Sequence, residues 1–237
     1  MPVQLICLPF AGAGASFFWP WRSLDPRVTV RALQLPGREK RIDDEPFEDV
    51  EGAADALVAE LIADPGLDEG PVALFGHSLG AVLAYELARR LRASGVAVAR
   101  LFVSGSPGPW SPRARRATGL DDEQFLAEVE TLAGYRHAAF DDPDMRGMLL
   151  PVLRADVEMH ENYRPEPHAP TDVGVTALRG ARDDLVTAEE LAGWAAVTTG
   201  GCEQVELPGG HMYLTDSARA VLSIVVSRCT PVPAGRG

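Results

Sequence analysis

Residues 72–91, VALFGHSLGAVLAYELARRL, place a serine between two glycines where a buried strand passes into a helix. The apolar run 72–75 follows a glycine and a proline and is typical of a strand that is buried on both faces. From Leu79 onward, apolar residues recur at helical spacing, and arginines gather near the end, where cations stabilise the helix dipole. Residues 76–80 are therefore predicted to form a sharp strand-to-helix turn, in which Ser78 is either an exposed nucleophile or only a small residue in a tight turn.

Strand-like runs and helical patterns alternate along the rest of the chain. The strand-like runs are residues 3–8, 28–35, 72–75, 101–104, 173–178 and 204–207, and the main helical patterns are residues 50–63, 79–92, 188–196 and 217–229. A chain of 237 residues, 46% of them hydrophobic, is long enough to bury one sizeable core. We therefore predict a single α/β protein with a mostly parallel central sheet flanked by helices on both faces.

The segment from about 118 to 164 breaks this alternation, because it contains helical patterns and no good strand. Such an insertion between strands of a parallel sheet is typical of a helical lid over ligands at the carboxyl ends of the strands, although a long crossover with extra helices is the alternative. Pro151 is expected to break or kink the second helical pattern. The predicted organisation is a core of residues 1–117 and 166–230, a lid insertion of residues 118–165, and a flexible tail of residues 231–237.

The charge balance excludes some classes of protein. There are 22 basic and 34 acidic residues, and a nucleic-acid-binding protein would ordinarily have the opposite balance. The chain has no apolar run as long as a membrane span, and its start lacks the basic residues of a signal peptide, so we expect a cytoplasmic protein that binds neither nucleic acid nor membrane. Cys7, Cys202 and Cys229 are an odd number without metal-ligand spacing, so free thiols are expected rather than disulfides or a metal site.

A serine hydroxyl is a weak nucleophile unless a base removes its proton and an acid orients that base. His211 is the candidate base, because it follows a strand pattern and two glycines, whereas His77 lies inside the turn and is expected to point into the fold. The loop after the preceding strand contains Asp183 and Asp184, of which Asp183 is the candidate acid and Asp184 is expected to cap a helix or face solvent. The chain order Ser78, Asp183, His211 is that of α/β-hydrolases.

The first strand runs into PFAGAGAS, a loop of small residues whose backbone N–H groups can face a developing oxyanion. The N–H of Leu79, directly after the serine and at a helix N-terminus, is one candidate donor, and the N–H of Ala11 or Phe10 is the other. The glycines of this loop do not form a dinucleotide-binding fingerprint, because Phe17 stands where the third glycine is required. We therefore expect no nucleotide cofactor.

Six motifs together resemble those of type II thioesterases, the stand-alone editing hydrolases of modular polyketide synthases and nonribosomal peptide synthetases. They are LPFAGAGAS, LQLPGREKR, FGHSLGA, LLPVLRADVEMHENY, LRGARDDLV and LPGGHMYL, and they span residues 8–214 in the expected order. The chain departs from the family pattern at Phe10, where histidine is common, and at Asp184, where proline is common. The second departure leaves open which carboxylate orients His211.

The resemblance implies an α/β-hydrolase fold and the hydrolysis of acyl groups from the phosphopantetheine arms of acyl or peptidyl carrier proteins. Ser78 would form the acyl-enzyme, and the protein would need no metal or cofactor of its own. The apolar lid residues either line the acyl chamber or only pack the lid onto the core; they are Phe125, Leu132, Met148, Leu149 and Met159.

Two basic groups are candidate docking surfaces for acidic carrier proteins, although most such runs are only solvated. They are Arg113, Arg115 and Arg116 in one group, and Arg38, Lys40 and Arg41 in the other. A carboxylesterase, a lipase or a medium-chain acyl-carrier thioesterase would share the triad, and a non-catalytic hydrolase-fold binding protein would share only the fold. A malonyl-type acyltransferase is disfavoured, because it commonly has glutamate where this chain has Ala81 and lacks the late aspartate and histidine.

Overall fold

Six parallel strands form one sheet at the centre of the protein, in the order β2-β1-β3-β4-β5-β6. The strands are β1 (Val3–Leu8), β2 (Val28–Ala32), β3 (Val72–His77), β4 (Val98–Ser104), β5 (Val175–Gly180) and β6 (Cys202–Leu207). This computed structural model describes residues 2–68, 72–111, 116–133 and 138–229, so the expected tail, 231–237, lies outside the described residues. The observed order confirms the mostly parallel sheet predicted from the alternating pattern.

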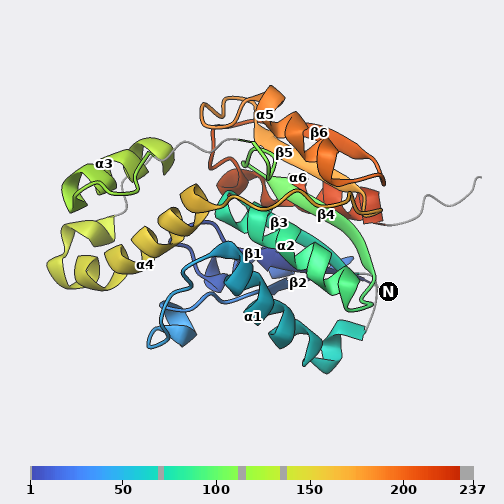
Figure 1. The fold of residues 1–237 in the computed structure, drawn as a ribbon, viewed down its shortest axis with the longest axis horizontal. Coiled ribbons are helices and arrows are strands. Elements are labelled where there is room, and N and C mark those ends of the chain that lie inside the picture. Colours follow the sequence, from blue (N-terminus) through green and yellow to red (C-terminus); the bar gives the residue numbers. More distant parts are fainter. Residues whose placement is uncertain (1, 69–71, 112–115, 134–137, 230–237) are drawn as a thin grey trace, which may run out of the picture.

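Helices cover both faces of this sheet (Figure 1). The α-helices are α1 (Val50–Ile62), α2 (Leu79–Ala93), α3 (Asp122–Ala133), α4 (Pro143–Asn162), α5 (Ala188–Ala192) and α6 (Leu214–Cys229). The short 3-10 helices are η1 (Ala15–Ser23), η2 (Glu39–Arg41), η3 (Pro65–Asp68), η4 (Ala138–Asp141) and η5 (Gly193–Val197). Neighbouring residues of a strand belong to hydrophobic clusters on opposite faces of the sheet. In β3, Leu74 packs with residues of α1 and α2, and Phe75 packs with residues of α6. The apolar run of β3 is therefore buried on both faces, as its composition predicts.

Some elements end at positions other than those predicted. The second strand-like run continues to Leu35, but β2 ends at Ala32, and Leu33 and Leu35 are buried in the loop that follows. The helix predicted for residues 188–196 is divided into α5 and the 3-10 helix η5. Apolar patterning reports burial, and burial alone does not distinguish a strand end from a buried loop.

The predicted lid insertion contains α3, η4 and α4 between β4 and β5, and its role as a lid stays a prediction. Both α3 and the first half of α4 project to one side of the sheet, away from α1 and α2 (Figure 1). Pro151 was expected to break or kink this helix. The break is wrong, since α4 runs through this residue as one helix, and the kink stays a prediction. Pro151 is exposed, so water can satisfy the carbonyl of Gly147 that loses its helical partner.

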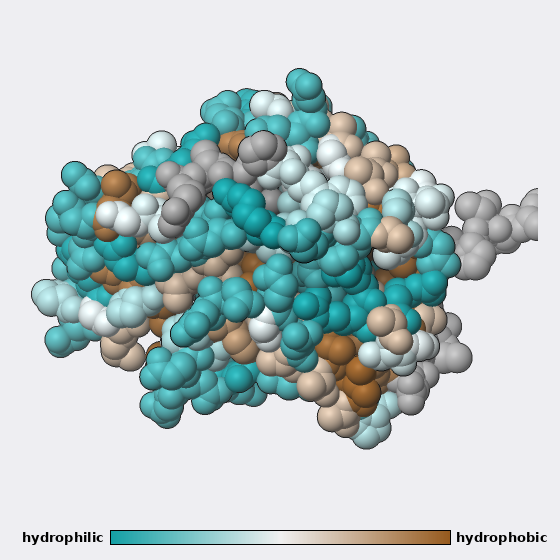
Figure 2. Space-filling view, viewed as in Figure 1, coloured by the Kyte–Doolittle hydropathy of each residue, from teal (hydrophilic) through white to brown (hydrophobic). Residues whose placement is uncertain are grey.

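The surface seen in the view of Figure 1 is mainly hydrophilic, with only smaller hydrophobic patches (Figure 2). This agrees with the formal net charge of −12. None of the helices in the described part of the chain combines the length and the apolarity needed to cross a membrane.

The three cysteines are free thiols, as expected. Cys7 is fully buried in β1, and burial raises the pKa of its thiol far above the ordinary value. Cys202 and Cys229 are half-buried, and burial raises the pKa of these thiols too. All three are therefore protonated and weakly nucleophilic at neutral pH.

A buried glutamate joins the beginning of the lid insertion to its end. Glu161, in the last turn of α4, accepts hydrogen bonds from the backbone N–H groups of Arg116, Ala117 and Thr118 at 2.9, 3.0 and 2.9 Å. The hydroxyl of Thr118 donates a further bond of 2.6 Å. Burial raises the pKa of Glu161, but the hydroxyl and the three N–H groups together lower it below the ordinary value of 4.5. The charged carboxylate therefore stabilises the folded state.

We expect Glu161→Gln to destabilise the protein at neutral pH more than at acid pH. Because the folded-state pKa is lowered, the contribution of the carboxylate is fully present above the ordinary value of 4.5 and is lost as the pH falls through the folded value. Urea unfolding of the wild type and the variant at a series of pH values between about 7 and about 3 measures this difference. A difference that stays constant over the whole series would contradict the assignment.

Candidate active site

Ser78 lies in a strained turn between β3 and α2. Its backbone angles are φ 54° and ψ −116°, a combination that is costly for a residue with a Cβ atom. The N–H of Ser78 donates to the carbonyl of Ser104 at the end of β4, at 2.8 Å, which fixes the turn against the neighbouring strand. The residue is half-buried, so part of it remains accessible to solvent.

The two glycines of the turn are required by close backbone packing. A Cβ atom on Gly76 would overlap the carbonyl of Gly80, and one on Gly80 would overlap the carbonyl of Leu8 at the end of β1. The start of α2 therefore rests directly on the ends of β3 and β1. This packing confirms the sequence argument for the glycines and brings the loop after β1 beside the Ser78 turn.

Asp183 faces His211. The Nδ1 atom of His211 lies 3.0 Å from Oδ2 of Asp183, and Oδ1 of Asp183 accepts the N–H groups of Leu185 and Val186 at 2.9 and 3.2 Å. The adjacent Asp184 is exposed. Of the two neighbouring aspartates, Asp183 is therefore the one that contacts His211 in the structure, and its role as the catalytic acid stays a prediction. Leu185 and Val186 act through backbone N–H groups, which no residue pattern reveals.

The charge of Asp183 is stabilised where it lies. The residue is 3% exposed, and burial raises the pKa of its carboxyl. The hydrogen bond and the charge of His211, together with two backbone N–H groups, outweigh burial, so the pKa lies below the ordinary value of 3.8. At neutral pH the carboxylate is ionised and can hold the His211 ring with its Nδ1 protonated.

The His211 ring lies above the carboxyl ends of β3 and β4. The centroid of the His211 ring is 4.8 Å from that of the ring of His77, the last residue of β3. The ring also lies so close to Gly105, which follows β4, that a Cβ atom at this position would be 3.0 Å from Cε1 of His211. The structure therefore brings residues 78, 183 and 211 to one edge of the sheet. Within the described residues the Ser78 hydroxyl and the His211 ring are not hydrogen-bonded, and such bonds often form only in the complex with substrate.

A series of buried hydrogen bonds holds the His77 ring, which contacts the His211 ring. Nδ1 of His77 is 2.8 Å from Oγ of Ser104, which is 2.6 Å from the hydroxyl of Tyr213. Burial lowers the pKa of His77 most, and the charges of His211 and His160 lower it further. The pKa lies well below its ordinary value, so this ring is neutral. His77 points into the fold, as expected. The sequence analysis did not identify Ser104 and Tyr213 as site residues. Ser104 ends a strand and Tyr213 follows His211 by two positions, and these positions were the signals that could have placed them near the site.

The two segments that contain the candidate oxyanion donors lie in close contact. Leu79 is the first residue of α2, so its N–H has no acceptor within the helix. The close contact between Gly80 and the carbonyls of Leu8 and Pro9 places the following residues, Phe10 and Ala11, next to this helix end. The ring of Phe10 lies edge-on to that of His77, with the centroids 6.0 Å apart. Leu79, Ala11 and Phe10 thus come from two segments that the fold brings together.

The sequence of the chain also identifies its family. The family model described as a thioesterase domain matches residues 3–229. The chain belongs to the thioesterase family. A probable cadicidin biosynthesis thioesterase from Streptomyces griseus is 36% identical over 97% of this chain, which spans 63% of that relative's length. Thioesterase PikA5 from Streptomyces venezuelae is 39% identical over 90% of this chain and 76% of its own length.

Solved structures agree with this assignment. YbtT, the type II thioesterase from the yersiniabactin NRPS/PKS biosynthetic pathway, matches this thioesterase with a TM-score of 0.87 and 27% identity. The match covers 96% of this chain and 92% of YbtT. The expectation of a type II thioesterase with an α/β-hydrolase fold is therefore confirmed.

The apolar lid residues of the thioesterase do not form one continuous surface. Phe125 is fully buried among residues of α3 and α4, and the guanidinium of Arg154 lies 4.3 Å from the centre of its ring. Met159 is also buried and belongs to the cluster formed with α1 and α2. Leu132 and Leu149 are half-buried, and Met148 is 53% exposed. Phe125 and Met159 are thus packed inside the protein, and the part of the five residues in an acyl chamber stays a prediction.

One of the two basic groups is not a surface. Arg38 is 5% exposed and forms a buried ion pair with Asp156, so its part in a docking surface was wrong. A charge pattern cannot reveal a partner 118 positions away in the chain. Of the other residues, Lys40 and Arg116 are exposed, and Arg41 pairs with Asp44 and Glu60. Arg113 and Arg115 lie outside the described residues.

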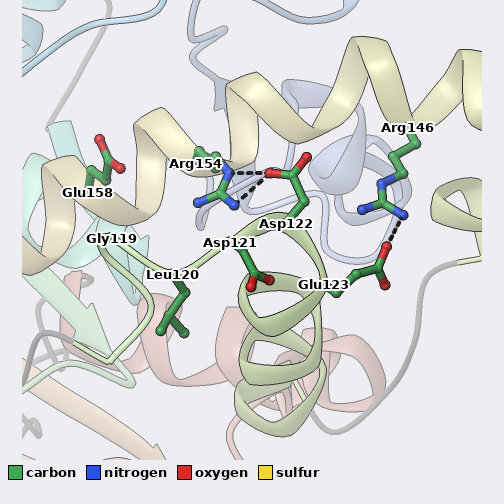
Figure 3. A pocket seen from close by; sticks show the side chains of 8 residues that line it. All are labelled: Gly119, Leu120, Asp121, Asp122, Glu123, Arg146, Arg154 and Glu158. Atoms are coloured by element: carbon green, nitrogen blue, oxygen red, sulfur yellow. Dashed lines mark hydrogen bonds and ion pairs between the residues drawn. The ribbon is translucent and has the colours of Figure 1, made fainter.

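An open hollow of about 850 Å³, lined mainly by charged residues, lies between α3 and α4 (Figure 3). Four of its charged side chains form two ion pairs, Arg154 with Asp122 and Arg146 with Glu123, each at 2.7 Å. Residues 78, 183 and 211 do not line it. The hollow is therefore not the chamber in which Ser78 would react.

Proposed function

We propose that this thioesterase hydrolyses acyl thioesters on the phosphopantetheine arms of acyl or peptidyl carrier proteins, and so removes stalled or incorrect acyl groups during polyketide or peptide biosynthesis. The single observation that supports this most is the ionised Asp183 bonded to His211, beside the strained turn of Ser78, in a chain of the thioesterase family. We place the enzyme in the cytoplasm, in keeping with its free thiols.

In the proposed mechanism, His211 removes the proton of the Ser78 hydroxyl, and Oγ attacks the thioester carbonyl. The N–H groups of Leu79 and of Ala11 or Phe10 stabilise the oxyanion. The C–S bond then breaks, and the carrier thiol leaves with the proton from His211. A water molecule, deprotonated by the same ring, attacks the acyl-enzyme, releases the carboxylic acid and restores Ser78. The mechanism uses no metal and no cofactor of the enzyme itself.

A comparison of substrates tests this function. The same acyl group is presented as a carrier-protein thioester, as a small soluble thioester and as an oxygen ester, and the released acid is measured. We expect the carrier thioester to have the highest kcat/KM, because only it offers the protein contacts of the natural substrate. Equal or faster hydrolysis of the oxygen ester would indicate a carboxylesterase, and tight binding without turnover would indicate a binding protein.

A further inference from the structure

A buried ion pair connects the lid to the core next to the proposed site. Asp156 in α4 is 2% exposed, and Arg38, which precedes η2, is 5% exposed. Nη2 of Arg38 donates to Oδ1 of Asp156 at 2.7 Å, and Nη1 donates to Oδ2. Nε of Arg38 donates to the carbonyl of Pro36 at 3.1 Å, which fixes the plane of the guanidinium. The pair is therefore a rigid two-bond contact between segments far apart in the sequence.

The same pair holds the loop after β1. The N–H of Gly12 donates to Oδ2 of Asp156 at 2.8 Å, and Nη1 of Arg38 donates to the carbonyl of Ala13 at 3.2 Å. Gly12 has φ +76°, and a Cβ atom there would lie 2.8 Å from Cδ1 of Leu153 in α4. One carboxylate thus fixes both the guanidinium and a peptide group of a half-buried loop in which Gly12 is exposed.

This peptide directly follows the proposed oxyanion donors. Ala11 and Phe10 immediately precede Gly12, and the carbonyl of Phe10 accepts the N–H of Ala13 at 3.0 Å, so residues 10–13 form one tight turn. Fixing Gly12 and Ala13 therefore fixes the direction of the N–H groups of residues 10 and 11. Oxyanion stabilisation depends on such donors being held in place before the reaction, and a misplacement of about 1 Å can cost roughly a hundredfold in rate.

We propose that Asp156 and Arg38 are positioning residues for the reaction. They hold the Gly12 peptide so that the loop after β1 presents its N–H groups to the oxyanion formed at Ser78. This inference rests on the proposed function. The competing explanation is that the pair only stabilises the attachment of the lid, and the two explanations predict different behaviour when the pair is replaced by apolar residues.

The double variant Arg38→Met/Asp156→Leu separates them. A buried ion pair can often be replaced by apolar residues of similar size without loss of stability, whereas the N–H of Gly12 then loses its acceptor. For this folded variant we expect kcat to fall by about a hundredfold with a smaller change in KM. The affinity for an acyl trifluoromethyl ketone, whose adduct with Ser78 places an oxyanion in the same site, should fall by a similar factor.

Glu161→Gln is the matched control. It changes another buried carboxylate of α4 that accepts backbone N–H groups, but at residues 116–118 instead of the loop after β1. We expect it to lower the melting temperature and to leave kcat and the inhibitor affinity near those of the wild type. An equal loss of kcat and inhibitor affinity in this control would overturn the proposal.

The proposal also fails if the double variant keeps the kcat and the inhibitor affinity of the wild type. Should that variant not fold, Asp156→Ala is measured instead, because it removes both carboxylate oxygens and with them the acceptor of the Gly12 N–H, which asparagine would keep. Unchanged kcat and inhibitor affinity in Asp156→Ala overturn the proposal, and a parallel fall in both supports it. The wild type and Ser78→Ala run in the same assay test the proposed function separately, so that the two failures are distinguishable.

Discussion

Replacing Ser78 with alanine is expected to lower kcat for an acyl-carrier thioester by roughly a millionfold. The remaining activity would lie near the detection limit of most assays. The variant keeps the fold, because the strain of the turn lies in the backbone and alanine has the same Cβ atom as serine. It removes the only atom that the mechanism uses to form the acyl-enzyme, so His211 has no hydroxyl to activate. Steady-state hydrolysis, measured with the wild type and the variant at equal concentration, gives this ratio.

Covalent labelling provides an independent readout of the same prediction. A fluorophosphonate should modify the wild type at Ser78 and leave Ser78→Ala unmodified, as measured by the mass of the modified peptide. Ser104→Ala is the matched control, since Ser104 lies at the same sheet edge but has its hydroxyl between His77 and Tyr213. Substantial turnover by Ser78→Ala, or labelling at Ser104 in the wild type, would contradict the assignment of the nucleophile.

The parts of the site that were predictable from the sequence are those set by local patterns. The two-sided apolar run of β3 and the glycines of the turn specify a buried strand, a sharp turn and a helix over only a few residues. His211 was identifiable from its place after a strand and two glycines. These features depend on near neighbours in the chain, so the sequence displays them directly.

The other parts depend on contacts between distant residues. Asp183 and Asp184 have the same chemistry, and only the N–H groups of Leu185 and Val186 and the position of His211 distinguish them. Arg38 belongs to an exposed-looking basic run, yet its partner is on α4. Such residues were misread or left open because burial of a charge is decided by the partner that the fold supplies.

The choice between the two aspartates leads to the second large effect. Asp183→Asn is expected to lower kcat by about ten-thousandfold, since an amide can donate to Nδ1 of His211 and favour the tautomer that cannot accept the serine proton. The variant also loses the charge that stabilises the imidazolium formed during the attack. Hydrolysis of the acyl-carrier thioester measures the loss, and the unfolding transition of the variant shows whether the fold is kept.

Asp184→Asn is the control that the chain itself offers, because it makes the same chemical change one position away. Asp184 is exposed, whereas Asp183 is buried against His211, so we expect the control to keep the kcat of the wild type and to change the stability little, as for most exposed substitutions. The reverse order of the two effects would show that Asp184 orients His211 in the reacting enzyme. A similar large loss in both variants would show that the two carboxylates act together. Either result would contradict the arrangement in which Asp183 alone accepts the hydrogen bond from Nδ1 of His211.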